Sequence, residues 1–359
     1  MNKILLLVTV SFLLNIATAQ TGTNTPWTFV KGDTAIPLLP SYGTKGVPSA
    51  LNQPGGRTGF VTGKDKKGNF WLFGGYRNQA FLNDLWKYDP TTNIWTWVSG
   101  DNVPGSDGVY GTKGVASPSN KPAGRMLAVA WMDSTDNLWV FGGEGYFNDL
   151  WKYNISTNEW TWMSGGSPTG KGNYGRLGVE AAGNQPGVRS RALGWSDISG
   201  NLWLFGGTGY DNNADASGEL NDLWKYNSST NAWTWVKGDS IMHGKAVYGT
   251  KGVAAKDNKP DARSQSVGWT DNGGTFWLFG GFRLTDTFPF RALSNDLWKY
   301  DPRTNEWTWV NGDSSYNVEG IYGLQGVSSP VNKPGARHSS ISWKDNSGNF
   351  WLFGGAENE

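Results

Sequence analysis

Three glutamates are the side chains whose type best suits acid/base chemistry. Glu144, Glu180 and Glu219 each occupy a position at which the other copies of an internal repeat carry a different residue. General acid/base catalysis needs a carboxyl group whose surroundings set its pKa apart from those of its neighbours. The sequence identifies no partner for any of the three, so each is a candidate without an assigned role.

The supply of histidine and cysteine limits the other kinds of chemistry. The chain has no Cys and 2 His, His243 and His338. Disulfides, thiol nucleophiles and Cys-ligated metals are therefore excluded, and two unclustered histidines do not build a catalytic zinc site. We predict no catalytic residue, no metal site and no cofactor. We interpret His338 as an ordinary strand residue, because the other copies carry different types at its position: Thr58, Met126, Ser190 and Ser264.

An aspartate recurs six residues before a strand tryptophan in every copy. It lies in a turn between two short apolar runs, residues 58–62 and 69–73 in the first copy, which we predict to be the strands of a hairpin. Because Asp accepts hydrogen bonds from backbone amides in turns, we interpret it as an Asx-turn cap. A calcium site, or a role like that of the loosely similar sialidase Asp box, is the alternative. The members are Asp65, Asp133, Asp197, Asp271 and Asp345.

The elements that must position these side chains are repeated along the chain. NDLWKYDPTTNIWTW (83–97) returns in near-identical form at 148–162, 221–235 and 295–309. A Tyr-Gly pair lies 15 residues before an Arg, and this Arg lies 17 residues before a Gly-Gly pair. The period averages about 70 residues, which accommodates four short strands. The arginines are Arg57, Arg125, Arg189, Arg263 and Arg337.

Side-chain alternation inside the motif is that of β-strands. In WTW, Trp95 and Trp97 share one face of a strand and Thr96 points to the other. In LWKY, Trp86 and Tyr88 share a face in the same way. The sequence therefore predicts an all-β fold.

WLFGG (71–75), NDLWKYDP (83–90) and NIWTWV (93–98) resemble the kelch repeat of β-propellers, and their equivalents cover nearly all of the chain. The resemblance implies four-stranded blades, at least five of them, with six or seven in a longer natural chain. The link from one blade to the next is unusually long, which is similar to exported bacterial kelch proteins. The galactose-oxidase-like propellers also belong to this group, but their copper site needs a Cys, which this chain lacks, and two His, whereas His243 and His338 lie in a link and at a strand start.

Most of the repeated residues are expected to form the frame. The Gly pair provides backbone freedom or close approach, and Trp and Tyr fill the space between successive blades. Arginines such as Arg125 are expected to bond carbonyls of a neighbouring loop. The predicted framework residues are Gly74, Gly75, Trp86, Trp95, Trp97, Arg125, Gly142, Gly206, Gly280 and Gly354.

The interval between Gly-Gly and NDLW is the part that varies. It covers residues 76–82, 144–147, 208–220 and 282–294, which we predict to be loops on one face, together with the long links. Variable loops on a rigid scaffold are the usual place for recognition. We predict binding of a protein or glycan there, the alternatives being merely solvated loops or a carbohydrate-active enzyme like a kelch sialic-acid epimerase. The predicted binding residues are Tyr76, Arg77, Tyr146, Tyr210, Phe282, Arg283 and Arg291.

Residues 1–19, MNKILLLVTVSFLLNIATA, have the pattern of a cleavable signal peptide. We therefore expect a propeller over 20–359 that is secreted, periplasmic or on the cell surface, with no transmembrane segment. The 31 Lys and Arg balance the 30 Asp and Glu, so nucleic acid is not an expected partner. PWTFVKGD (26–33) is expected to form a lone fourth strand. Since WLFGGAENE ends on a second strand, the propeller is expected to be C-terminally incomplete.

Overall fold

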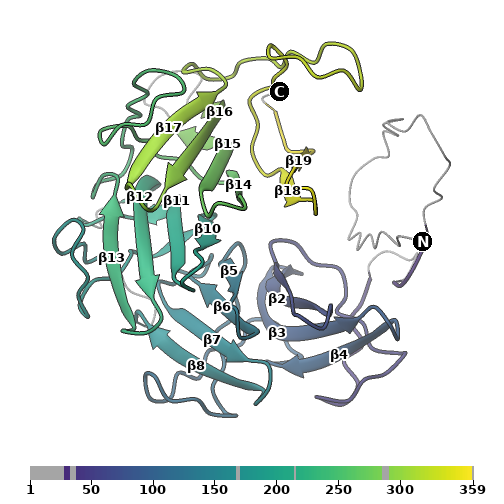
Figure 1. The fold of residues 1–359 in the computed structure, drawn as a ribbon. Coiled ribbons are helices and arrows are strands. Elements are labelled where there is room, and N and C mark those ends of the chain that lie inside the picture. The colour runs from purple at the N-terminus through teal and green to yellow at the C-terminus, as the bar shows by residue number, and fades with distance from the viewer. Residues whose placement is uncertain (1–27, 33–37, 167–169, 214–215, 285–290, 358–359) are drawn as a thin grey trace. The chain divides into compact units, whose positions relative to one another are not determined.

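The computed structural model describes residues 28–32, 38–166, 170–213, 216–284 and 291–357, and all of the regular elements in these ranges are β-strands. The chain divides into two compact units. Figure 1 draws the strands of both as arrows, coloured by residue number. Unit 1 comprises residues 1–109 and 121–126, and unit 2 comprises residues 110–120 and 127–359. None of the described residues forms a helix long and apolar enough to cross a membrane. The predicted signal peptide, residues 1–19, lies outside the described residues.

Unit 1 contains one antiparallel four-stranded sheet, which we call blade 1. Its strands pair in sequence order, as expected when short turns join neighbours. They are β1 (Val61–Lys64), β2 (Phe70–Arg77), β3 (Ala80–Asp89) and β4 (Ile94–Ser99).

Unit 2 contains three further blades. Blade 2 is β5 (Val129–Met132), β6 (Asn137–Phe141), β7 (Leu150–Asn154) and β8 (Glu159–Ser164). Blade 3 is β10 (Leu193–Ser196), β11 (Leu202–Tyr210), β12 (Ser217–Asn227) and β13 (Ala232–Lys237), with β9 (Arg189–Ser190) also paired to β11. Blade 4 is β14 (Val267–Thr270), β15 (Phe276–Leu284), β16 (Arg291–Asp301) and β17 (Glu306–Asn311).

A fifth sheet in unit 2 has two strands, β18 (Ile341–Lys344) and β19 (Phe350–Phe353). The first strands β5, β10, β14 and β18 contact one another in succession, which is the arrangement of propeller blades. The described residues thus contain four blades of four strands, and the predicted minimum of five such blades is not confirmed. The lone fourth strand predicted at 26–33 is also not seen: residues 28–32 form no strand, and residues 26, 27 and 33 lie outside the described residues.

The fixed spacing of the repeat is explained by one buried carboxylate in each blade. In blade 1 the Asp84 carboxylate accepts two hydrogen bonds from Arg57, at 2.5 and 2.8 Å, and both side chains are fully buried. It also accepts from the Tyr42 hydroxyl at 2.9 Å and from the Trp86 indole at 2.7 Å. Arg57 in addition donates to the carbonyl of Gly74 at 3.0 Å. The repeated Tyr, Arg and Trp therefore meet at a single side chain, Asp84, and the Gly pair is joined to them through Arg57. Asp222 and Asp296 have the same contacts in blades 3 and 4.

The Gly-Gly pair brings two successive blades into close backbone contact. Gly206 has a φ of 61°, and a Cβ placed on it would lie 2.7 Å from the carbonyl oxygen of Arg263. The N–H of Gly207 donates to this same oxygen at 2.9 Å. A side chain at position 206 would collide with backbone, so the predicted need for close approach is confirmed here.

The long link before each blade runs along the fourth strand of that blade. Ala181 pairs with Trp233 of β13, and the N–H of Gly178 donates to the Trp235 carbonyl at 2.8 Å. The amide of Asn184 donates to the Trp233 carbonyl at 3.1 Å. An edge strand with unpaired backbone groups is a site for unwanted pairing, so this cover accounts for the length of the link.

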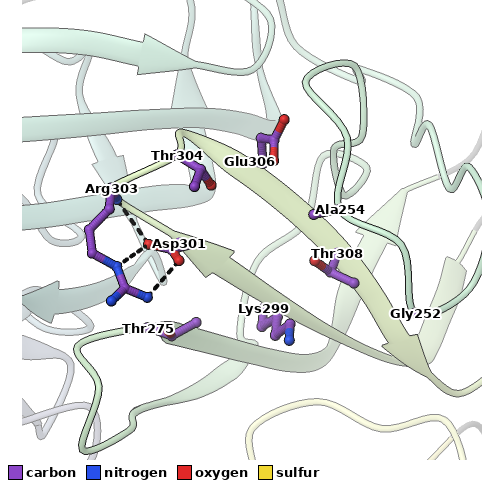
Figure 2. A pocket seen from close by; sticks show the side chains of 9 residues that line it. All are labelled: Gly252, Ala254, Thr275, Lys299, Asp301, Arg303, Thr304, Glu306 and Thr308. Carbon is purple, nitrogen blue, oxygen red and sulfur yellow. Dashed lines mark hydrogen bonds and ion pairs between the residues drawn. The ribbon is translucent and has the colours of Figure 1, made fainter.

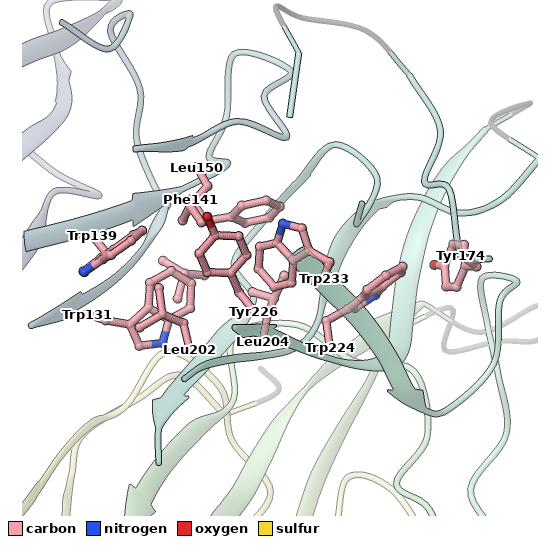
Figure 3. Close-up of a cluster of buried hydrophobic side chains, with 11 residues drawn as sticks. Trp131, Trp139, Phe141, Leu150, Tyr174, Leu202, Leu204, Trp224, Tyr226 and Trp233 are labelled. Atoms are coloured by element: carbon pink, nitrogen blue, oxygen red, sulfur yellow. The ribbon is translucent and has the colours of Figure 1, made fainter. Parts of the chain in front are cut away.

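Aromatic rings fill the space between blades 2 and 3 (Figure 3). The centroid of Phe141 on β6 lies 5.5 Å from that of Trp233 on β13, and Trp139 lies 5.8 Å from Tyr226. Trp233 and Trp307, each the first Trp of its WTW motif, thus pack between blades, as predicted. Trp97, the second Trp of its motif, instead packs edge-on against Tyr42 of the preceding link, with centroids 5.0 Å apart.

The intervals predicted as variable loops are mostly strand. After the Gly pair a β-bulge shifts the register and pairing resumes, so that β2 and β3 are joined by the two-residue turn Asn78–Gln79, both with positive φ. The same extension occurs in β11–β12 and β15–β16, whereas in blade 2 no strand covers 142–149. The prediction was wrong because glycine at a bulge was interpreted as the end of a strand. The strands predicted at 58–62 and 69–73 are shifted accordingly, to β1 and β2.

Candidate binding site

The second residue after each blade arginine has a left-handed backbone in unit 2. Leu127, Arg191, Gln265 and Ser339 have φ values of 54°, 58°, 58° and 56°. The N–H of each of the last three donates to the carbonyl of the one before it, at 2.9, 3.0 and 3.0 Å. We call these four residues the inner ring. Positive φ is unfavourable for residues other than glycine and concentrates at functional sites.

Polar side chains of the inner ring are bonded to one another. The Ser339 hydroxyl donates to the Gln265 amide oxygen at 2.5 Å. His338 Nδ1 lies 3.1 Å from that oxygen and 2.9 Å from the hydroxyl. Burial, together with the positive charges of Arg191 and Arg291, lowers the pKa of His338 below its usual 6.5. The imidazole is therefore neutral at neutral pH and can accept or donate a hydrogen bond.

Charged and aromatic side chains adjoin the inner ring. Arg191 forms an ion pair with Glu144 at 2.5 Å, and both remain partly exposed. Tyr146 and Tyr210 lie side by side with ring centroids 6.5 Å apart, and Tyr146 is 66% exposed. Phe282 contacts the His338 ring at 5.8 Å. We call Glu144, Tyr146, Tyr210, Phe282 and His338 the rim.

The predicted binding residues are distributed between the two units. Tyr146, Tyr210 and Phe282 belong to the rim in unit 2, and Arg291 is exposed at the start of β16. Arg283 is largely buried and donates to Asp261 at 3.0 Å and to the Tyr316 hydroxyl at 2.8 Å. Tyr76 and Arg77 lie on β2 in unit 1, where Tyr76 packs on Phe81 with ring centroids 5.5 Å apart.

Sequence reasoning missed the inner ring. Its residues are of unrelated types, so no motif marks them, and a positive φ is readable from sequence only where the residue is glycine. The first copy does carry this signal, since Gly59 occupies the same position with a φ of 66°. The interpretation of His338 as an ordinary strand residue missed its place beside the ring.

The three candidate glutamates have different surroundings. Glu144 lies on the rim, as described above. Glu180 accepts hydrogen bonds from the Thr230 hydroxyl at 2.6 Å and from the Asn227 amide at 3.2 Å. Glu219 is 1% exposed, and its carboxylate lies 3.9 Å from Nδ1 of His243. Among the three, Glu144 is the one beside the inner ring.

The hairpin aspartates have the predicted capping geometry. The Asp197 carboxylate accepts from the N–H of Asn201 at 3.0 Å and from the indole of Trp203 at 2.8 Å. For Asp65 burial alone would raise the pKa, but hydrogen bonds from Asn69 and Trp71 outweigh it and lower the pKa. The carboxylate oxygens thus already serve the turn and its tryptophan. No group of three His, Asp or Glu that could hold a metal occurs in the part of the chain that the structure describes.

A shallow pocket of about 280 Å³ lies at the far end of blade 4 from the start of β16 (Figure 2). Asp301 and Arg303 in its wall are joined by hydrogen bonds of 2.9 and 2.7 Å, and the Arg303 side chain is 70% exposed. Lys299 and Glu306 add one charge of each sign. The charges are largely balanced within the pocket, so it has no marked preference for an ion of either sign.

Comparison with known proteins identifies the family. The KLHDC2/KLHL20/DRC7 Kelch-repeats domain matches residues 111–315, more than half of the chain, and the Kelch motif matches residues 67–99. The chain belongs to the kelch-repeat family. The resemblance of WLFGG and NDLWKYDP to the kelch unit is thereby confirmed, and the blades described above are kelch blades.

Individual relatives match this chain at low identity. Multiple epidermal growth factor-like domains protein 8 of Homo sapiens is 26% identical over 207 residues, 56% of this chain, and the Mus musculus protein is 27% identical over 195 residues, 53% of this chain. The kelch chain spans about 6% of the length of these curated relatives. The solved structure of YjhT has a TM-score of 0.52 and 14% identity, covering 86% of this chain and 80% of the other, which supports the fold.

Proposed function

We propose that this kelch protein is an exported, non-catalytic binding scaffold that takes a protein or glycan segment on the inner ring and rim of unit 2. The observation that carries the proposal is the exposed Tyr146, packed on the half-buried Tyr210 beside a ring of polar groups held in left-handed backbone. Export is inferred from the pattern of residues 1–19.

The chemistry of the site suits an extended ligand with both apolar and polar groups. Tyr146 and Phe282 offer ring faces for an aliphatic or sugar surface. Gln265, Ser339 and His338 offer donors and acceptors in fixed positions, since each is already bonded to the others. Binding sites typically combine a few aromatic anchors with such polar groups on a rigid frame. Kelch propellers commonly bind proteins, which favours a protein segment.

The test is capture of partners by the purified chain, with a peptide library and a glycan array as the two sources of ligand. The double variant Tyr146→Ala/Tyr210→Ala removes the tyrosine pair and should lower the affinity of captured ligands at least tenfold. Arg303→Ala, at the far end of blade 4, is the matched surface control and should bind normally. Equal binding by wild type and the Tyr variant would remove the rim from the site.

One observation favours a second function, that of a carbohydrate-active enzyme. Glu144 is a carboxylate ion-paired with Arg191 next to the inner ring, which is the kind of acid/base and anion-holding pair that the enzyme alternative requires. Incubation of the purified protein with sialic acid and other free sugars, followed by NMR, tests this alternative. Turnover that disappears in Glu144→Gln would establish it in place of the scaffold.

A further inference from the structure

Two arginines at equivalent positions have opposite environments. Arg77 in blade 1 and Arg283 in blade 4 are each the second residue after the Gly-Gly pair. The Arg283 guanidinium is bonded to the fully buried Asp261 carboxylate at 3.0 Å and to the Tyr316 hydroxyl at 2.8 Å, and it lies 5.3 Å from the Tyr316 ring centroid. In blade 4 the protein itself thus supplies a carboxylate and a hydroxyl to this arginine.

Blade 1 supplies neither group. The position of Asp261, two residues before the blade arginine, is occupied by Gly55, and the position of Tyr316, nine residues after the first Trp of WTW, is occupied by Pro104. The Nε and Nη1 atoms of Arg77 are buried and have no hydrogen-bond partner in the described part of the chain. The side chain as a whole keeps partial exposure.

The backbone around Gly55 prevents the missing carboxylate from being restored in place. Gly55 has a φ of 71°, and a Cβ on it would lie 2.8 Å from the Pro40 nitrogen and 3.0 Å from Arg77 Nη1. The Asp84 carboxylate of the same blade is already used by Arg57, Tyr42 and Trp86. Neither position 55 nor Asp84 therefore supplies a partner for Arg77.

A buried guanidinium without a partner is costly, because desolvation of a charge is repaid only by an opposite charge or by hydrogen bonds. Its planar fork matches a carboxylate. We propose that Arg77 is a binding site for the carboxylate of an Asp or Glu side chain of a protein partner, which balances the charge of Arg77 as Asp261 balances that of Arg283 in blade 4. The inference rests on the proposed binding function and concerns blade 1 of unit 1 by itself.

The experiment selects peptides from a displayed random library on the wild-type chain and repeats the selection on Arg77→Met. Wild type should enrich peptides that contain Asp or Glu. Changing the key acid to Asn or Gln, or using Arg77→Met, should each weaken binding roughly tenfold to a hundredfold, the loss expected for one charged hydrogen-bonded pair. Together the two changes should cost little more than either alone, which a direct contact requires.

Selected peptides without acidic enrichment, or peptides that bind Arg77→Met as tightly as wild type, would overturn the proposal. Capture of glucuronate or galacturonate but no peptide, lost in Arg77→Met, would overturn the protein partner as the source of the carboxylate. Circular dichroism of Arg77→Met verifies that the variant is folded, and Arg77→Lys, which keeps the charge without the fork, provides a second variant. If peptides bind and depend on Tyr146 and Tyr210 but not on Arg77, only this inference fails; if nothing binds at all, the proposed function fails too.

Discussion

Blades 1 and 4 are built from the same repeat, yet they treat the arginine after the Gly pair differently. Both blades have the buried Arg–Asp pair, Arg57–Asp84 in one and Arg263–Asp296 in the other. Blade 4 adds a second carboxylate, Asp261, which bonds both Arg263 and Arg283. In blade 1 its place is taken by Gly55, and two buried nitrogen atoms of Arg77 have no hydrogen-bond partner among the described residues.

The difference shows which residues of a repeat maintain the blade and which are free to differ between blades. The residues that meet at Asp84 and Asp296 cannot vary independently, because each satisfies a buried group of another. Residues 55 and 261 do not belong to that common set, so they can differ without breaking the blade. Function is therefore expected where equivalent residues keep their type but change their partners.

The largest effect is expected from removing the shared carboxylate. Asp84→Ala leaves Arg57 buried without its charge partner and should lower the free energy of unfolding by roughly 3–5 kcal/mol. Asp296→Ala should cost less, because Arg263 keeps a 2.7 Å bond from Nε to Asp261. Urea unfolding followed by tryptophan fluorescence measures both. Asp301→Ala, which removes an exposed ion pair, is the control and should cost under about 0.5 kcal/mol. Equal losses in the two blades would show that Asp261 does not support Arg263.

Replacement of Arg283 and of Arg77 should change the free energy of unfolding differently. Arg283→Met breaks a buried pair and should lower the free energy of unfolding by about 2 kcal/mol. Arg77→Met removes a charge that has buried, unpartnered nitrogens, so stability should stay equal or rise by up to about 1 kcal/mol. The two variants carry the same chemical change and serve as controls for each other in thermal and urea unfolding. A loss in Arg77→Met as large as in Arg283→Met would mean that Arg77 has a partner within the protein.

Much of the frame was predictable, because its signals are local. The strand alternation of LWKY and WTW and the kelch resemblance led to the correct fold class. The role of Asp84 was missed, because the sequence shows that Asp recurs but does not show that Arg57, Tyr42 and Trp86 converge on it. The contrast between Arg77 and Arg283 depends on residues 22 positions earlier, Gly55 and Asp261, which the local pattern of the loop does not reveal. The inner ring was missed because Arg191 and Gln265 carry no residue-type sign of a positive φ.

The tyrosine bonded to each buried carboxylate should make the stability of the protein depend on pH in the alkaline range. Burial, and next the charge of Asp84, raises the pKa of Tyr42 from 10 to about 12, and burial and Asp296 raise that of Tyr248. A raised folded-state pKa means that stability is fully present below pH 10 and is lost as pH rises toward the folded value. Tyr42→Phe should lose about 1 kcal/mol at pH 8, since one hydrogen bond to Asp84 is removed, but should lose less than wild type between pH 10 and 11.5. Tyr322→Phe, which changes an exposed tyrosine whose hydroxyl accepts a hydrogen bond from Arg337, is the control, and an unchanged alkaline slope in Tyr42→Phe would contradict the assignment.

The smallest expected effect is a shift in the pKa of His338. It compares two arginines of one hairpin in blade 4, Arg283, whose charge is balanced by a carboxylate, and Arg291. Arg283 is paired with Asp261, whereas the positive charge of Arg291 is among the causes that lower the pKa of His338, after burial and Arg191. A lowered folded-state pKa means that the contribution of His338 to stability is present above pH 6.5 and is lost as pH falls through the folded value.

Titration of the two histidine Cε1–H signals by NMR, assigned with His243→Gln, should therefore place the His338 midpoint below 6.5. Arg291→Gln should move this midpoint up by a few tenths of a pH unit, an amount typical of one partly screened charge. Arg283→Met should leave it in place, because Asp261 already balances the Arg283 charge. An equal shift in both variants would show that the internal carboxylate does not neutralise its arginine, and the contrast drawn with Arg77 would then lose its basis.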